Sequence, residues 1–205
     1  MDVSEISGIT LAPPGAVRLS VAQGKQRLAV QEFIGAMFAR AHHAHIKHYM
    51  PVLLSLNAPD GALAMACGLR AAAVSDLFLE QYLAQPVQVA LALAAAKPVA
   101  RSAIVEVGNL AVAAHTPARQ LIVALTRYLA ATPLQWVVCT VLPQLRNSFS
   151  RLGIPHHELG PACIESLSLA DRADWGNYYD AQPVVIAINI AAALQAIELG
   201  ELATA

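Results

Sequence analysis

The amino-acid sequence predicts an α/β (α+β) fold in which one mixed central sheet carries helices on both faces. Early in the chain, two apolar runs flank a turn-forming segment, and later in the chain strand-like and helix-like segments alternate. Apolar residues make up 57% of the 205 residues and charged residues 13%, against usual shares of about 45–50% and about 25%. Such a chain can bury a large core, and its length suits one domain.

The first part of the chain is expected to form a strand, a long helix and a hairpin. Residues 1–16 contain two prolines and two glycines and are interpreted as a loose lead-in to a single domain over residues 17–205. Apolar residues alternate with period two in the first strand and recur at helical spacing in the long helix. The segment Asn57–Gly61 has the composition of a hairpin turn. The expected elements are a strand over 17–21, a helix over 25–42 and hairpin strands over 52–56 and 62–72.

The rest of the chain alternates helices with strands. Alanine, leucine and glutamine favour helices, whereas continuous apolar, β-branched runs favour interior strands. Thr116 is the expected N-cap of a helix that has Pro117 at its first position. The other expected elements are helices over 77–83, 86–96, 145–152 and 191–199, and strands over 103–112, 134–142 and 183–190.

Charge and hydropathy exclude several classes of partner. The net charge is −1, from 13 basic and 14 acidic residues, so the chain has no electrostatic footprint for nucleic acid and no polybasic membrane patch. The mean hydropathy is +0.51, but the longest apolar runs, 89–96 and 184–194, are shorter than the about 20 residues of a spanning helix. Stable membrane insertion is therefore not expected. The start of the chain does not resemble a signal peptide, and three cysteines without metal-type spacing are typical of reduced thiols. We expect a cytoplasmic protein.

Glu106 is the leading candidate for chemistry. It lies inside the otherwise apolar strand 103–112, where burial should raise the pKa of its carboxyl group. A carboxylate of this kind suits general-base work near neutral pH. The alternative, a structural glutamate satisfied by backbone groups or an arginine, has equal weight. Gly108 and Asn109 interrupt the same strand and indicate a bulge or the close approach of a ligand.

The helix that follows this strand offers a second candidate feature. Unpaired N–H groups at a helix N-terminus can hold a phosphate. Arg119, in the first turn after Thr116, could add a charge-assisted contact. Because every helix has an N-terminus, this signal is weak by itself.

Histidines gather near the end of the first long helix, at His42, His43, His45 and His48. His45 and His48 share one face if the helix continues that far. A metal site needs a third ligand, and no acidic or cysteine partner is close in sequence, so no metal is predicted. One useful histidine at an exposed helix end is the preferred interpretation. His156-His157 is assigned to a loop.

Isolated charges and a group of aromatic residues complete the candidates. Arg70 ends an apolar strand and Glu80 lies in an apolar helix. A structural ion pair between them is slightly favoured over a catalytic role. Trp175, Tyr178 and Tyr179 lie within five residues and suit a pocket wall, although a plain packing loop would look the same.

Five sequence blocks stand out together: His48–Pro51, Gly68–Ala71, Leu77–Leu83, Glu106–Ala111 and Trp175–Tyr179. They resemble the thermostable hemolysin family of bacteria, in an order that fits from about residue 39 to residue 190. The strand order and the Glu-bearing central strand also resemble the GNAT-like acyltransferase fold, particularly the acyl-homoserine-lactone synthases.

The resemblance to the synthases implies roles for particular residues. Arg70 would position the substrate and Glu106 would act as the base, with Asn109 and His45 beside them. Asn109 stands where the synthases have arginine. The pyrophosphate signature of acetyltransferases is missing between Val112 and Leu121. This departure puts tight coenzyme A binding in doubt and leaves room for an acyl carrier protein as donor.

The leading functional hypothesis is acyl transfer from a thioester of coenzyme A or phosphopantetheine to an amine or hydroxyl of a small molecule. Backbone N–H groups near Leu110–Val112 would stabilise the thioester oxyanion. A membrane-active hemolysin, acting through the tail 184–199, and a non-catalytic acyl- or lipid-binding protein are the alternatives. A homodimer is left open. The expected donor contacts are Leu110, Ala111, Val112, Thr116, Arg119 and Thr140, and the expected substrate contacts are Glu80, His48, Trp175, Tyr178 and Tyr179.

Overall fold

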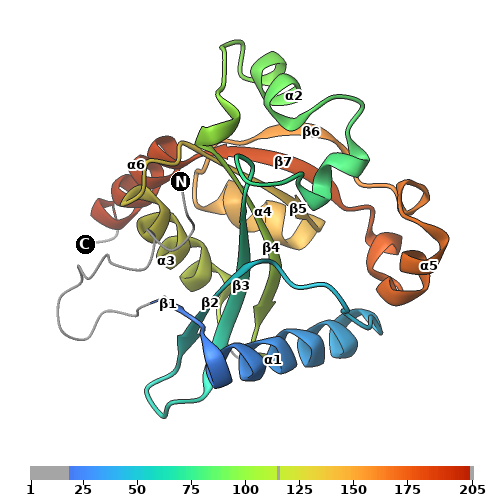
Figure 1. Cartoon of the computed structure of the whole chain (residues 1–205). Helices are drawn as coiled ribbons and strands as arrows, with labels where there is room; N and C mark the ends of the chain where they lie inside the picture. Colours follow the sequence, from blue (N-terminus) through green and yellow to red (C-terminus); the bar gives the residue numbers. More distant parts are fainter. Residues whose placement is uncertain (1–18, 115, 204–205) are drawn as a thin grey trace.

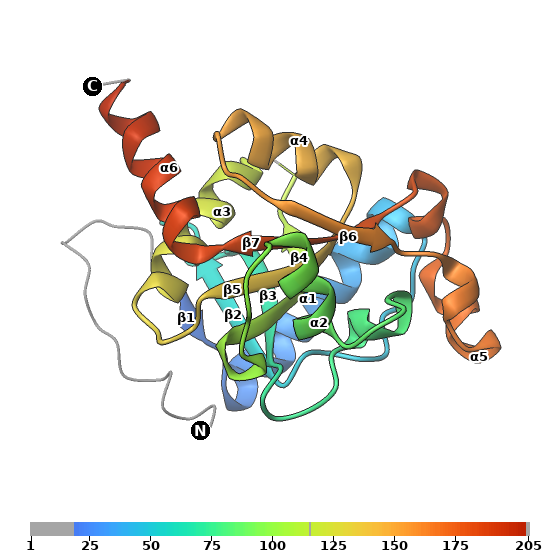
Figure 2. The same ribbon diagram turned by 90° about the horizontal axis from the view of Figure 1, so that it is seen from above.

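A seven-stranded mixed sheet lies between two layers of helices in the computed structural model, which describes residues 19–114 and 116–203 (Figures 1 and 2). The predicted fold class is confirmed. The expected lead-in, residues 1–16, and the start of the first predicted strand lie outside the described residues.

The strand order is β1-β2-β3-β4-β5-β7-β6, and every neighbouring pair is antiparallel except β4 and β5. The predicted hairpin is β2–β3, and the predicted interior strands are β4 and β5. The strands are β1 Ser20–Val21, β2 Val52–Asn57, β3 Leu63–Ala71, β4 Ile104–Val112, β5 Trp136–Val141, β6 His157–Pro161 and β7 Val184–Asn189.

Helices cover both faces of the sheet, as expected. The α3, α4 and α6 helices lie on one face, and α1 and α2 lie on the other (Figure 2). Successive residues of a strand point to opposite faces of the sheet, so Val105 and Val107 of β4 pack in the layer of α3, whereas Ile104 packs in the layer of α2. The α-helices are α1 Gly24–His42, α2 Val87–Ala94, α3 Ala118–Ala130, α4 Pro143–Arg151, α5 Leu169–Arg172 and α6 Ile190–Leu202, and the 3₁₀ turn η2 is Phe78–Tyr82.

Four sequence expectations need correction. His157, assigned with His156 to a loop, begins the edge strand β6, which pairs with β7. Gly160 and Pro161 are residue types that are depleted in strands, so this segment lacks the alternating pattern by which a strand is predicted. The N-cap of α3 is Pro117 rather than Thr116, and no side chain caps this helix. The α1 helix ends at His42 because His43 adopts a left-handed conformation, with φ of 54°; His45 and His48 therefore share no helical face.

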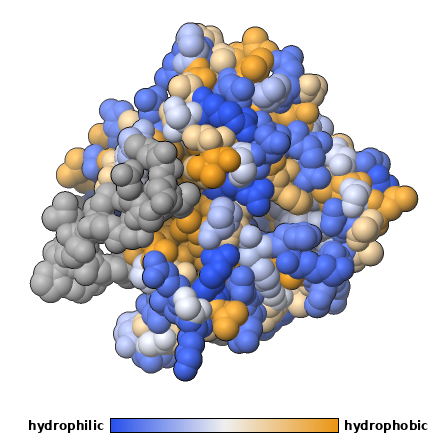
Figure 3. All heavy atoms as spheres, viewed as in Figure 1, coloured by the Kyte–Doolittle hydropathy of each residue, from blue (hydrophilic) through white to orange (hydrophobic). Residues whose placement is uncertain are grey.

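The fourth correction concerns the tail 184–199, the candidate segment of the membrane-active alternative. Its strand part, β7, lies between β5 and β6, and its helical part, α6, buries Ile190, Ala193 and Ile197. Among the large hydrophobic side chains of α6, Leu199 and Leu202 near its end are exposed, by 60% and 75%. On the face seen in Figure 3, hydrophobic residues are interspersed with hydrophilic ones. Within the described residues, no helix is long and apolar enough to cross a membrane.

Candidate active site

The site begins where the two parallel central strands separate. Pairing between β4 and β5 runs from Ile104/Trp136 to Val107/Cys139 and stops there, although both strands continue. Opposite β3, strand β4 has an extra residue next to Asn109, whose φ is 49°. A bulge bends and twists its strand. The bulge thus turns the second half of β4 away from β5 and opens a gap in the middle of the sheet.

A cavity of about 630 Å³ occupies this gap and reaches both faces of the sheet. Protein interiors are close-packed and leave few voids larger than a water molecule, so a space of this size indicates a ligand site. One end is polar and aromatic. The other end enters the core between the sheet and the helices α3 and α4, where the wall is apolar. That apolar wall includes Leu121, Ile122, Leu125, Leu129, Phe149, Ile154 and Ile188.

Glu106 lines the cavity at the point where the strands separate. Only 3% of the surface of Glu106 is exposed to solvent. Its Oε2 accepts the N–H of Phe78 at 2.8 Å, and its Oε1 accepts the N–H of Leu79 at 3.0 Å. Burial raises the pKa of its carboxyl group to about 7, against the lowering effect of these two N–H donors and of Arg70. Near neutral pH, the group is therefore able to take up and release a proton.

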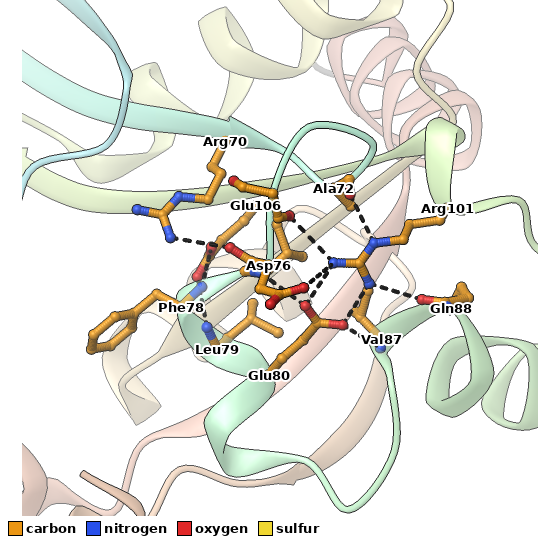
Figure 4. A network of polar contacts seen from close by, with 12 residues as sticks. Arg70, Ala72, Asp76, Phe78, Leu79, Glu80, Val87, Gln88, Arg101 and Glu106 are labelled. Atoms are coloured by element: carbon orange, nitrogen blue, oxygen red, sulfur yellow. Dashed lines mark hydrogen bonds and ion pairs between the residues drawn. The ribbon is translucent and has the colours of Figure 1, made fainter. Parts of the chain in front are cut away.

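Arg70 lies directly across the strand pair from Glu106 and lines the same cavity. Its Nη1 donates to the backbone oxygen of Asp76 at 3.2 Å (Figure 4). The expected ion pair between Arg70 and Glu80 is absent, because Glu80 pairs with Arg101 at 2.6 Å. Within the part of the chain that the structure describes, no carboxylate lies within ion-pair distance of the Arg70 guanidinium.

Asn109 holds the chain segment that covers the bulge. Its Oδ1 accepts the N–H of Met50 at 2.8 Å, and its Nδ2 donates to the oxygen of His48 at 3.4 Å. Met50 lies against Gly68 and Gly108, which face each other across β3 and β4; a Cβ atom on either glycine would overlap the Met50 side chain. The close approach expected at Gly108 is thus made by this chain's own Met50. Asn109 lines the cavity, but its amide is engaged in fixing this wall.

Aromatic side chains form the wall of the polar end. Trp175, Tyr178 and Tyr179 line the cavity, as the sequence suggested. Their ring centroids lie 5.2–5.8 Å apart. Sequence analysis missed three further members, Phe38, Phe78 and Tyr82. The hydroxyl groups of Tyr82 and Tyr179 are 2.5 Å apart. No local pattern distinguishes these three from ordinary core residues; only the fold brings them together.

Two distant segments cross at the mouth of this aromatic wall. The N–H of His45 donates to the oxygen of Asp174 at 2.6 Å, and the N–H of Asn177 donates to the oxygen of His42 at 2.9 Å. Lys47 and Asp174 form an ion pair at 2.7 Å. Gly176, with φ of 51°, passes so close to the backbone of His42 and His43 that no side chain would fit there.

Among the described residues, no cluster of histidine, cysteine and carboxylate side chains could hold a metal ion.

The other expected site residues divide into those that line the cavity and those that do not. Three expected contacts do not line the cavity: Glu80, Thr116 and the exposed Arg119. The start of α3 nevertheless borders the cavity through Ala118. The expected residues that line it are His45, His48, Leu110, Ala111, Val112 and Thr140.

This arrangement, a central sheet parted at a bulged strand with a cavity through the gap, is a GNAT-like fold. The chain belongs to the thermostable hemolysin family, whose model matches residues 21–194. No curated protein matches the sequence significantly.

Several solved structures share the fold at low identity. TofI, in a ternary complex with an inhibitor and MTA, has a TM-score of 0.60 and 16% identity over 88% of this chain and 96% of its own. FeeM, an N-acyl amino acid synthase from uncultured soil microbes, has a TM-score of 0.61 and 14% identity over 91% and 97%. BjaI, a CoA-dependent acyl-homoserine lactone synthase with SAM and isopentyl-CoA, has a TM-score of 0.57 and 15% identity over 89% and 86%.

Proposed function

We propose that this protein transfers an acyl group from a thioester donor, coenzyme A or an acyl carrier protein, to the amine of a small molecule. The observation that carries the proposal is Glu106. It combines burial, a pKa raised to about 7 and a place in the cavity where β4 leaves β5. A base with a pKa near the working pH is best suited to general-base catalysis.

In the proposed reaction, the acceptor nitrogen attacks the thioester carbonyl carbon, and the C–S bond breaks. Glu106 takes the proton that the nitrogen loses, directly or through water, and the departing thiolate is protonated in turn. The products are an amide and a free thiol. The N–H of Ala113 donates to Ala64 on β3, so strand alternation directs the N–H of Val112 toward the gap. By the same alternation, Leu110 presents its N–H there to the developing oxyanion.

The two ends of the cavity suit the two substrates. The apolar end, between the sheet and α3, fits an acyl chain, and the start of α3 lies beside it. At the polar end, Arg70 and Glu106 face the same space from adjacent strands. An α-amino acid would place its amine at Glu106 and its carboxylate at the Arg70 guanidinium. FeeM, an N-acyl amino acid synthase on the same fold, supports this class of acceptor.

A donor–acceptor matrix tests the proposal. Acyl-CoA and acyl-carrier thioesters of several lengths are incubated with a pool of amino acids, with free-thiol release and product mass as readouts. We expect thiol release to require both substrates, and Glu106→Gln to abolish it. Glu158→Gln is the matched control, because Glu158 is an exposed carboxylate on β6. Absence of turnover with every donor, together with no acyl binding in native mass spectrometry, would contradict the proposal.

The same cavity is also consistent with a second function, in which the protein binds an acyl chain or lipid without catalysis. Its apolar end alone is enough to hold an acyl chain. Mass spectrometry of co-purifying molecules separates the two functions, since a binder retains a ligand that never turns over.

A further inference from the structure

Arg101, in the turn just before β4, joins four chain segments through one side chain (Figure 4). Its Nε donates to the oxygen of Ala72, at the end of β3, at 2.8 Å. Its Nη1 donates to Gln88 of α2 at 2.9 Å, and its Nη2 to the oxygen of Ser75 at 3.3 Å. Both Nη atoms also reach Glu80, at 2.6 and 2.8 Å. This planar, bidentate geometry is specific to arginine.

Glu80 is the centre of this network, although it lies outside the cavity. Its Oε2 accepts the N–H of Leu77 at 2.8 Å, and its Oε1 accepts the N–H of Val87 at 2.9 Å. The hydrogen bond from Arg101 is the main reason that the pKa of the Glu80 carboxyl group is held low, at about 2. Glu80 therefore stays ionised and, through Arg101, links the start of η2 and the start of α2 to the turn that precedes β4.

The turn held in this way supplies the hydrogen-bond donors of Glu106. The N–H groups of Phe78 and Leu79 come directly after Leu77, which Glu80 holds. Adjacent N–H groups can both point at one carboxylate only while the turn keeps its shape. No other hydrogen bond to the Glu106 carboxylate occurs within the described residues.

We propose that Arg101 and Glu80 are positioning residues, which hold the Phe78 and Leu79 N–H groups against Glu106 and so set the orientation and protonation of the base. The catalytic consequence rests on the proposed function, but the effect on Glu106 itself does not. The charged or titratable groups that influence Glu106 or are influenced by it are Arg70 on β3, Glu80 and Tyr82 on η2, and Cys139 on β5.

Carbon-detected NMR titration of glutamate-labelled protein tests the proposal without any substrate, with the Glu106 signal assigned from Glu106→Gln. Arg101→Lys keeps the positive charge but cannot make the bidentate contact. Loss of the two N–H donors disfavours the carboxylate, so we expect the midpoint of the Glu106 titration to rise by about one pH unit. Glu80→Gln serves if the first variant does not fold, but its expected rise is smaller, because this variant also removes a negative charge that raises the pKa of Glu106. Arg146→Lys is the matched control, because Arg146 pairs with Glu158 on the exposed surface at 3.3 Å.

An unchanged Glu106 titration in both folded variants would overturn the proposal. A lowered midpoint in Arg101→Lys, which conserves charge, would also overturn it, because it would mean that the network excludes water from Glu106 rather than presents donors to it. If turnover is found, a rise of one unit predicts about a fivefold loss of kcat at pH 7 that recovers at pH 9, with donor KM unchanged. A shifted titration without turnover in any variant would refute the proposed function and leave the positioning role intact.

Discussion

Glu106 is the residue whose surroundings separate a catalytic role from a structural one. Its hydrogen bonds come from backbone N–H groups and not from a paired arginine. Glu106→Gln preserves the shape of the side chain but removes the ability to accept a proton. We expect thiol release to fall about 10²–10⁴-fold, as for loss of a general base, with a small change in thermal midpoint. A variant that is stable and fully active would remove Glu106 from the mechanism.

The raised pKa of Glu106 also predicts how stability depends on pH. A carboxyl group with a pKa of about 7 in the folded state and an ordinary pKa of 4.5 in the unfolded chain binds more protons when folded between these two pH values. Its contribution to stability is full below about pH 4.5 and is lost as the pH rises through 7. The difference in unfolding free energy between the wild type and Glu106→Gln should therefore change by about 3 kcal/mol between pH 4.5 and 8. Urea titrations at several pH values measure it; a flat difference would contradict the raised pKa.

At the scale of elements, the glycine pair on β3 and β4 decides how closely Met50 covers the bulge. A Cβ on Gly68 would overlap the Met50 Cβ and Cγ, whereas a Cβ on Gly108 would overlap only the flexible end of that side chain. We expect Gly68→Ala to cost about 1–3 kcal/mol by overpacking, and Gly108→Ala to cost less. Gly200→Ala in α6, where a Cβ meets nothing within 4 Å, is the control and should be neutral or stabilising. Equal losses at Gly68 and Gly200 would refute this account.

The start of α3 gives a second prediction at this scale. Arg119 is exposed in the first turn of a helix that begins beside the cavity. If the phosphates of the donor lie at this helix end, Arg119→Ala should weaken donor binding about tenfold and leave the thermal midpoint unchanged. Calorimetry with a non-hydrolysable acyl-CoA analogue measures it, with Arg127→Ala, further along the same helix, as a control. Unchanged affinity would remove the phosphate-site argument.

For the whole molecule, the sequence predicts the helices and strands better than it predicts which distant residues contact each other. The α1 helix and the β2–β3 hairpin follow from local periodicity and turn chemistry, and both are confirmed. The partner of Glu80 could not be found this way: two charges, Arg70 and Arg101, were available, and only the chain path between β3 and η2 decides between them. The aromatic wall of the cavity depends on contacts between residues far apart in sequence, which no local pattern predicts.

The burial of the tail bears on the membrane-active alternative. Because β7 is interior and α6 packs on α3, this segment has no continuous apolar face with which to enter a bilayer. We expect no dye release from zwitterionic or anionic vesicles by the wild type or by Glu106→Gln. Leakage at micromolar protein that is equal in both would instead support a physical, non-enzymatic lytic activity.

The crossing at Gly176 has a consequence for the order in which the molecule assembles. It joins His42 and His45 to Asp174 and Asn177, segments separated by well over half the chain. Contacts that close such long loops form slowly, whereas the β2–β3 hairpin closes a short one. We therefore expect the aromatic wall to be completed after the sheet during refolding. In pulse-labelling hydrogen exchange, the amides of His45 and Asn177 should gain protection later than those of β2 and β3, so the chain would hold a folded sheet before it holds a finished pocket.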